Sequence, residues 1–189
     1  MVDPDASASV ARRASFVPRS LLLSADDVRR AVRRMAHEVV ERIRDTDDVV
    51  VLGVQTGGVA FANLLADNLE EIAVHNVARG TLDVSFYRDD VDQRPFVNST
   101  ASSIAVDLTQ RIVVLVDDVL FTGRTIRSAL NALNDLGRPR AVQLAVMVDR
   151  GHRELPIRPD YVGKNLPSSL AEEIVATLEG VWIGERSCS

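Results

Sequence analysis

The chain has 189 residues, of which 46% are hydrophobic and 26% are charged, and its net charge is −5 at pH 7. This length suits one well-cored domain, and the acidic balance argues against indiscriminate nucleic-acid binding by the whole surface. The longest apolar runs are strand-sized, which predicts no membrane span, and the single cysteine, Cys188, excludes an internal disulfide and a cysteine-rich metal site.

The N-terminal segment 1–20 is expected to be a flexible tail. It contains Arg12 and Arg13 but no apolar stretch of the kind that a secretory signal needs, so we expect a cytoplasmic protein. We expect the remainder, 21–189, to form a single domain.

A helix, a strand and a second helix are predicted in the first third of this domain. Ser24 and Asp27 have the spacing of a capping box, and helical spacing of apolar residues continues from there to Ile43. Residues 49–54 form a buried-strand pattern that ends before the Gly57-Gly58 pair, and residues 59–69 again have helical spacing.

The rest of the chain continues this alternation of strands and helices. A strand is predicted at 81–87, followed by a polar excursion to 103. Further strands are predicted at 112–116, 142–148 and 174–178, with a helix at 125–136 and an irregular segment after 149. Alternating strands and helices predict an α/β fold with a mostly parallel sheet that helices cover on both faces.

The segment "VVLVDDVLFTGRTI" at 113–126 places two adjacent acids, Asp117 and Asp118, at the end of a buried strand. Ligands of parallel α/β sheets bind at this carboxyl edge. The following loop, 122–125, leads into a helix whose free N–H groups favour a phosphate, while the carboxylates accept hydrogen bonds from sugar hydroxyls or hold a magnesium ion. The motif therefore predicts a site for a phosphorylated sugar; the alternative is that the acids merely cap the helix.

Four apolar strand residues, two acids and a T-G-R-T loop resemble the PRPP-binding motif of type I phosphoribosyltransferases. Four segments are similar to the PyrR family of pyrimidine operon attenuation proteins, which are also uracil phosphoribosyltransferases: "RRMAHEVVER" at 33–42, "LDVSFYRDD" at 82–90, "VDDVLFTGRT" at 116–125 and the stretch 134–169, which contains "DRGHRELPIR". The resemblance implies the type I phosphoribosyltransferase fold with a small irregular hood.

The resemblance also implies roles for individual residues. Asp117 and Asp118 would hold the ribose hydroxyls of PRPP, and Arg88 would approach the pyrophosphate or its Mg²⁺; we take these three as the catalytic residues. No direct protein ligand to the metal is predicted. The residues expected to contact PRPP or the nucleotide are Thr56, Gly57, Arg88, Asp117, Asp118, Val119, Leu120, Phe121, Thr122, Gly123, Arg124, Thr125, Arg150 and Val162.

One departure from the family concerns the turn after the first strand of the sheet. Members of the family that the chain resembles have the residues K-T-R-G at this turn, whereas this chain has Gln55-Thr56-Gly57-Gly58. Two positive charges beside the pyrophosphate are lost, so we predict that transfer from PRPP to uracil is weakened or lost. The implied ligands are PRPP, uracil, UMP and UTP, and the implied assembly is a homodimer or higher oligomer that binds no DNA.

A row of cations on the first helix, 29–37, is by itself typical of a solvated helix face. The resemblance implies that part of this row and a later basic loop bind the leader RNA of the pyr operon. The residues concerned are Arg33, Arg34, His37, Arg153, Arg158 and Lys164. From sequence, we expect Arg153→Ala to weaken RNA binding and spare PRPP. Two alternatives are a salvage phosphoribosyltransferase with no RNA partner and a ligand sensor that acts through protein contacts.

Overall fold

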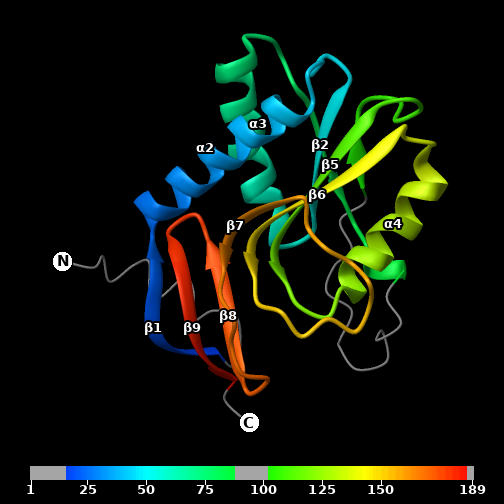
Figure 1. Cartoon of the computed structure of the whole chain (residues 1–189). Helices are drawn as coiled ribbons and strands as arrows, with labels where there is room; N and C mark the ends of the chain where they lie inside the picture. Colours follow the sequence, from blue (N-terminus) through cyan, green and yellow to red (C-terminus); the bar gives the residue numbers. More distant parts are fainter. Residues whose placement is uncertain (1–15, 88–101, 187–189) are drawn as a thin grey trace.

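The central feature of the computed structural model, which describes residues 16–87 and 102–186, is a six-stranded sheet in the order β4-β3-β2-β5-β6-β7 (Figure 1). All neighbouring strands are parallel except β3 and β4, so the predicted mostly parallel sheet is confirmed. The strands of this sheet are β2 (Val49–Val54), β3 (Ala78–Leu82), β4 (Ser103–Ile104), β5 (Ile112–Leu120), β6 (Ala141–Asp149) and β7 (Tyr161–Asn165).

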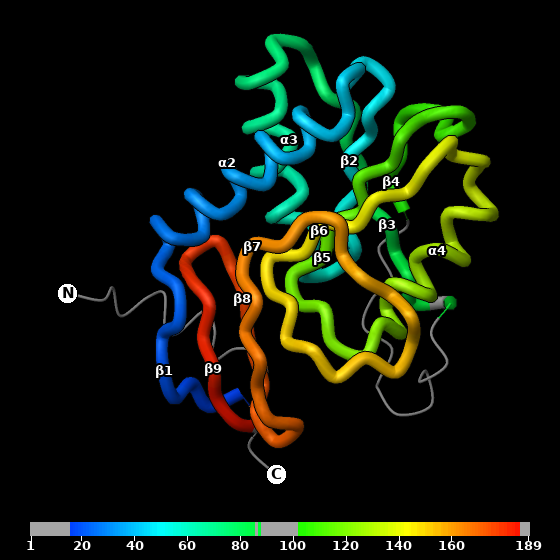
Figure 2. Tube along the Cα trace, in the orientation of Figure 1, coloured from blue at the N-terminus to red at the C-terminus, as the bar shows by residue number. Residues whose placement is uncertain are grey.

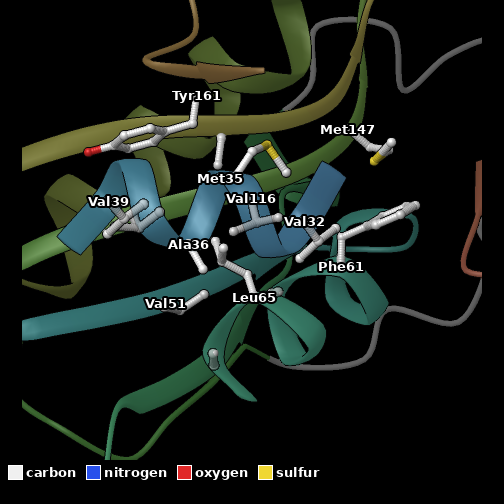
Figure 3. Packing of buried hydrophobic residues seen from close by; sticks show 14 of the residues in the cluster. Val32, Met35, Ala36, Val39, Val51, Phe61, Leu65, Val116, Met147 and Tyr161 are labelled. Carbon is white, nitrogen blue, oxygen red and sulfur yellow. The ribbon is translucent and has the colours of Figure 1, made fainter. Parts of the chain in front are cut away.

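Helices cover both faces of this sheet because its central strands are apolar on both sides. In β2, for example, Val49 and Val51 belong to one buried cluster and Val50 and Leu52 to the other. The first cluster packs against α2 (Ala25–Arg42) and α3 (Gly58–Ala73), and the second against α4 (Arg124–Leu136) (Figures 1 and 3). None of the helices in the described residues is long and apolar enough to cross a membrane.

The start of α2 confirms the predicted capping box. The Oγ atom of Ser24 accepts a hydrogen bond from the N–H of Asp27 at 3.3 Å, and Oδ2 of Asp27 accepts one from the N–H of Ser24 at 3.0 Å. From this start the helix places Val32, Met35 and Ala36 in the core beside α3 and the sheet (Figure 3). The capping box thus sets where α2 begins, and the packing of these apolar residues places the helix against the sheet.

A second, antiparallel sheet in the order β1-β9-β8 stands where an irregular hood was expected. It consists of β1 (Phe16–Ser24), β8 (Glu172–Thr177) and β9 (Gly180–Arg186). The hood is therefore regular, and the tail expected over 1–20 overlaps β1 from residue 16 onward. The strand predicted at 174–178 corresponds to β8, whereas β1 and β9 were not predicted. β1 is mostly exposed, and its pairing with β9 joins residues far apart in the chain.

Candidate functional site

The two adjacent acids lie within β5, which runs to Leu120 instead of ending at the predicted residue 116. Asp117 is buried and aligns with Val146 of β6, and Asp118 is half-buried. The N–H of Asp118 donates to Oδ1 of Asp117 at 3.0 Å, and the N–H of Val119 donates to Oδ1 of Asp118 at 2.8 Å. These backbone donors compensate part of the cost of placing neighbouring carboxylates in a strand.

The loop after β2 packs directly on these acids because it contains two glycines. A Cβ atom built on Gly57 would lie 2.0 Å from Oδ2 of Asp118, and one on Gly58 would lie 2.1 Å from the carbonyl oxygen of Val116. The peptide bond between Gln55 and Thr56 is cis. The tertiary structure thus brings the predicted residues Thr56 and Gly57 to the carboxyl edge of the sheet beside Asp118.

The loop between β5 and α4 has the geometry of an anion site at a helix N-terminus. Gly123 occupies the N-cap position with a φ of 92°, which favours glycine, and no side-chain hydrogen bond caps the helix there. The helix is 13 residues long, so the positive end of its dipole lies at this loop. The Oγ1 atom of Thr122 accepts a hydrogen bond from the N–H of Arg124 at 3.4 Å.

The side chain of Arg124, expected to add donors to this loop, is exposed and paired with Glu154. Its Nε donates to Oε2 of Glu154 at 2.7 Å, and its terminal nitrogen lies 2.6 Å from the same oxygen. The main-chain amides and the hydroxyls of Thr122 and Thr125 are therefore the principal donors of the loop.

Arg150 is a buried cation that joins this loop to the second sheet. Its guanidinium lies 4.3 Å from the ring centre of Phe121 and donates to the carbonyl oxygens of Ser169 and Glu172 at 2.8 and 2.6 Å. Burial lowers the pKa of Arg150 from its ordinary value. Arg150 therefore links Phe121 to the start of β8.

The segment predicted as strand 81–87 turns at Asp83 instead. β3 ends at Leu82, and the Asp83 carboxylate accepts hydrogen bonds from the N–H and hydroxyl of Ser85 at 2.8 and 2.6 Å. Asp83 is buried at the same sheet edge as Asp117, and our sequence analysis did not select it. Its signal is an acid directly after an apolar strand residue.

Arg88, one of the three predicted catalytic residues, lies outside the described residues. The residue before it, Tyr87, is tied to α4 at two points. Its hydroxyl donates to Oδ2 of Asp135 at 2.6 Å, which raises the pKa of Tyr87, and its carbonyl accepts a hydrogen bond from the Ser128 hydroxyl at 2.9 Å. The last described position before Arg88 is therefore fixed relative to α4.

The six residues predicted to bind RNA differ in what their side chains contact. Arg33 makes two hydrogen bonds to Glu71 at 2.9 and 3.1 Å, which lower the pKa of Glu71. Arg34 is paired with Glu38 and also donates to the β7 carbonyls of Val162 and Gly163 at 2.9 and 2.8 Å. Both guanidinium groups are therefore engaged within the protein.

The remaining predicted RNA contacts comprise three exposed residues and one enclosed arginine. His37, Arg158 and Lys164 are exposed, and none of them forms an ion pair within the part of the chain that the structure describes. Arg153 instead directs its guanidinium into the protein, where Nε donates to the carbonyl of Ile157 at 2.9 Å. Of these four side chains, three therefore face solvent and one is enclosed.

No group of three or more histidine, cysteine, aspartate or glutamate side chains among residues 16–87 and 102–186 is arranged to hold a metal ion. The adjacent carboxylates of Asp117 and Asp118 are enough for a Mg²⁺ ion that arrives bound to the oxygens of a phosphorylated substrate. Such an ion keeps several waters and needs only one or two carboxylates from the protein.

Comparison with known proteins identifies the family. The family described as "Phosphoribosyl transferase domain" matches residues 21–178. A protein named "Bifunctional protein PyrR" from Streptomyces coelicolor is 57% identical over 158 residues, which cover 83% of this chain and 82% of that protein. The chain belongs to the PyrR family. A relative of the same name from Trichormus variabilis is 53% identical over 86% of this chain and 90% of its own length.

Solved structures with low sequence identity confirm the fold. A hypoxanthine phosphoribosyltransferase from Staphylococcus aureus has a TM-score of 0.68 at 18% identity, covering 90% of this chain and 93% of its own. The hypoxanthine phosphoribosyl transferase of Trypanosoma cruzi has a TM-score of 0.70 at 17% identity, covering 89% and 92%. The predicted type I phosphoribosyltransferase fold and the predicted family are both confirmed.

Proposed function

We propose that the protein regulates the pyrimidine biosynthesis operon by uridine-nucleotide-dependent binding to the pyr leader RNA, and that it has weak uracil phosphoribosyltransferase activity. The observation that supports the proposal most directly is the placement of Asp117 and Asp118 beside the 55–58 loop and next to the N-terminus of α4. UMP and UTP are the regulatory ligands, PRPP and uracil are the substrates, and DNA is not a partner. The assembly is a homodimer or higher oligomer.

The two acids and the loop divide the recognition of the sugar phosphate between them. The ribose hydroxyls donate to the carboxylates of Asp117 and Asp118, which accept only. The 5′-phosphate accepts hydrogen bonds from main-chain N–H groups of the 122–125 loop and from the threonine hydroxyls, at the positive end of α4. Val119 and Leu120 at the end of β5, and Val162 near the start of β7, supply apolar and main-chain surroundings.

The reaction requires charge stabilisation and alignment rather than a protein nucleophile. The bond from the ribose C1 to the pyrophosphate oxygen breaks, and the electron pair leaves with the pyrophosphate. A uracil ring nitrogen forms the new bond to C1, and the proton of this nitrogen passes to water. Mg²⁺ enters with PRPP as part of the substrate and carries charge away with the pyrophosphate. As positive charge develops on the sugar ring, the neighbouring carboxylates of Asp117 and Asp118 stabilise it electrostatically.

The 55–58 loop is the reason to expect a low rate. Gln55 and Gly57 occupy the positions at which the family has lysine and arginine, so two charge-assisted contacts to the leaving group are missing. Such a loss costs about 3 kcal/mol in the transition state, or roughly a hundredfold in rate. Regulation needs nucleotide binding only, and that depends on the acids and on the 122–125 loop.

RNA binding uses the exposed cations His37, Arg158 and Lys164 together with the α2 row. Arg33 and Arg34 are paired with carboxylates, so RNA phosphates compete with Glu71 and Glu38 for these guanidinium groups. The net affinity gained per arginine is therefore smaller than for an unpaired cation, and it depends strongly on salt.

Two assays on the purified protein test the proposal. In the first, PRPP, Mg²⁺ and uracil are incubated with the protein, and a slow but measurable formation of UMP is expected; no product at high protein concentration rejects the enzymatic part. In the second, leader hairpin and scrambled RNA are titrated at physiological salt with and without UMP. Tighter binding of the hairpin in the presence of UMP is expected, and equal affinities reject the regulatory part and favour the salvage enzyme.

A matched pair of variants locates the RNA surface. Lys164→Ala removes an exposed cation at the carboxyl end of β7, whereas Arg138→Ala removes one from the opposite edge of the sheet, before β6. We expect the first to weaken hairpin binding about threefold to tenfold and the second to leave it unchanged. Equal effects of the two would indicate binding by net charge alone.

A further inference from the structure

The loop between β6 and β7, residues 150–158, encloses the loop that precedes α4 (Figure 2). The N–H of Arg150 donates to the carbonyl of Leu120 at 3.1 Å, and the N–H groups of Glu154 and Leu155 both donate to the carbonyl of Thr122 at 3.0 and 3.3 Å. All three of these contacts reach carbonyl oxygens of the 120–122 backbone.

The side chain of Arg153 supplies the central contact of this arrangement. One terminal nitrogen donates to the carbonyls of Phe121 and Gly151 at 2.8 and 3.1 Å, and the other donates to Oδ2 of Asp149 at 2.5 Å. The side chain is only 21% exposed. A guanidinium is planar and has five donors in a fixed geometry, so these acceptors hold it in one orientation.

Arg158 in the same loop provides an internal comparison. It is exposed, and the described part of the chain offers it no ion-pair partner. An arginine that recognises an external polyanion presents its donors to solvent, as Arg158 does. The guanidinium of Arg153 instead donates to backbone carbonyls of the protein.

Peptide geometry connects Arg153 to the phosphate loop. The carbonyl of Phe121 and the N–H of Thr122 belong to one planar trans peptide unit, so they point in opposite directions. The carbonyl of Thr122 and the N–H of Gly123 are related in the same way. Because Arg153 holds the first carbonyl and the 154–155 amides hold the second, the N–H groups of Thr122 and Gly123 are directed away from the 150–158 loop.

We propose that Arg153 is a positioning residue for the phosphate: it fixes the peptide units whose amides bind the 5′-phosphate, without touching the ligand. This inference rests on the proposed nucleotide site. It predicts a defect specific to the phosphate part of the ligand, because the acids that hold the ribose lie on β5, whereas the hydrogen bonds of the Arg153 side chain reach Asp149 and carbonyl oxygens that include those of Phe121 and Gly151. Substitution of a residue that merely maintained the fold would weaken the binding of all ligands alike.

The test compares UMP with uridine, which lacks the phosphate, by calorimetric titration of wild type, Arg153→Ala and Arg158→Ala. We expect Arg153→Ala to weaken the binding of UMP about tenfold or more and the binding of uridine less than about twofold, so that the ratio of UMP affinity to uridine affinity falls. Arg158→Ala loses the same charge from the same loop and should retain the wild-type ratio.

Arg153→Lys separates geometry from charge. Lysine keeps the positive charge but cannot span the carbonyl of Phe121 and the carboxylate of Asp149 together, so most of the loss in UMP affinity should persist. Restoration of the ratio by lysine, or equal losses in both alanine variants, would overturn the positioning role in favour of simple charge attraction. An unchanged ratio in Arg153→Ala would overturn it as well. Failure of the wild-type protein to bind UMP would instead refute the proposed nucleotide site.

Discussion

Substitution of Gly57 by alanine tests the role of Asp118 through its neighbour. The added methyl group would lie 2.0 Å from Oδ2 and 2.2 Å from Cγ of Asp118. Gly57 has a φ of −78°, which alanine adopts without strain, so the backbone has no reason to move. The carboxylate must therefore shift by more than about 1 Å to reach an ordinary van der Waals separation.

The magnitude follows from the hydrogen bonds that this shift breaks. Asp118 loses the 2.8 Å bond from the N–H of Val119, and in the complex it loses the ribose hydroxyl as donor. A hydrogen bond to a charged group contributes about 1.5–3 kcal/mol, which corresponds to roughly a tenfold to hundredfold loss in affinity for UMP. The smaller conformational entropy of unfolded alanine offsets part of the stability loss, by about 0.4–1 kcal/mol.

The assay is calorimetric titration with UMP together with thermal unfolding, and Gly58→Ala is the contrasting variant. Its methyl group would meet the carbonyl oxygen of Val116 at 2.1 Å, which is backbone inside β5 and cannot rotate away. We expect Gly57→Ala to lose affinity while keeping its melting temperature within a few degrees, and Gly58→Ala to lose stability. Wild-type affinity in Gly57→Ala would refute the argument that the Asp118 carboxylate holds the ribose.

Two further predictions concern the pH dependence of stability. Hydrogen bonds from Ser24 lower the pKa of Asp27 from 3.8 to about 2. The contribution of Asp27 to the stability of the folded protein is therefore complete above pH 3.8 and is lost as the pH falls through about 2. Ser24→Ala should remove most of this pH dependence and lower the melting temperature by about 2–4 °C. Burial raises the pKa of Tyr161 from 10.0 to about 12, so stability is retained below 10 and is lost as the pH rises through 12. The pKa of Tyr87 is raised as well, so tyrosinate absorbance during alkaline titration should show both tyrosines ionising above 10. Tyr161→Phe should remove the part of the absorbance change that appears near 12, and an unchanged amplitude there would contradict the assignment.

The elements predicted correctly are those specified by neighbouring residues. The capping box at Ser24 and Asp27 forms as expected, and the strand-loop-helix unit around Asp117 has the expected order. The prediction of a strand over 81–87 was wrong, because the Asp83 side chain bonds to Ser85 and turns the chain, whereas the apolar pattern alone favoured extension. Both β1 and β9 were missed, since each is stabilised by pairing with the other end of the chain.

In the candidate site, too, features set by neighbouring residues could be predicted, and contacts between distant segments could not. The presence of Asp117, Asp118 and the 122–125 loop could be inferred from sequence, because the order of residue types along one strand-to-helix connection is local information. The partners of Arg34 and Arg153 could not be inferred. The expectation that Arg153→Ala spares PRPP is replaced by the opposite prediction, because its guanidinium lies on the backbone of the phosphate loop, 32 residues away in the chain.

By itself, then, the sequence determined the alternation of strands and helices, the capped start of α2 and the chemical character of the sheet edge, all of which depend on residues within a few positions of one another. Only the tertiary structure decided which carbonyls the arginines contact, that Asp118 fills the space above Gly57, and that the two ends of the chain form a second sheet. The physical reason is that hydrogen-bond acceptors and van der Waals space are shared between segments that only folding brings together, and a linear pattern carries no distance between them.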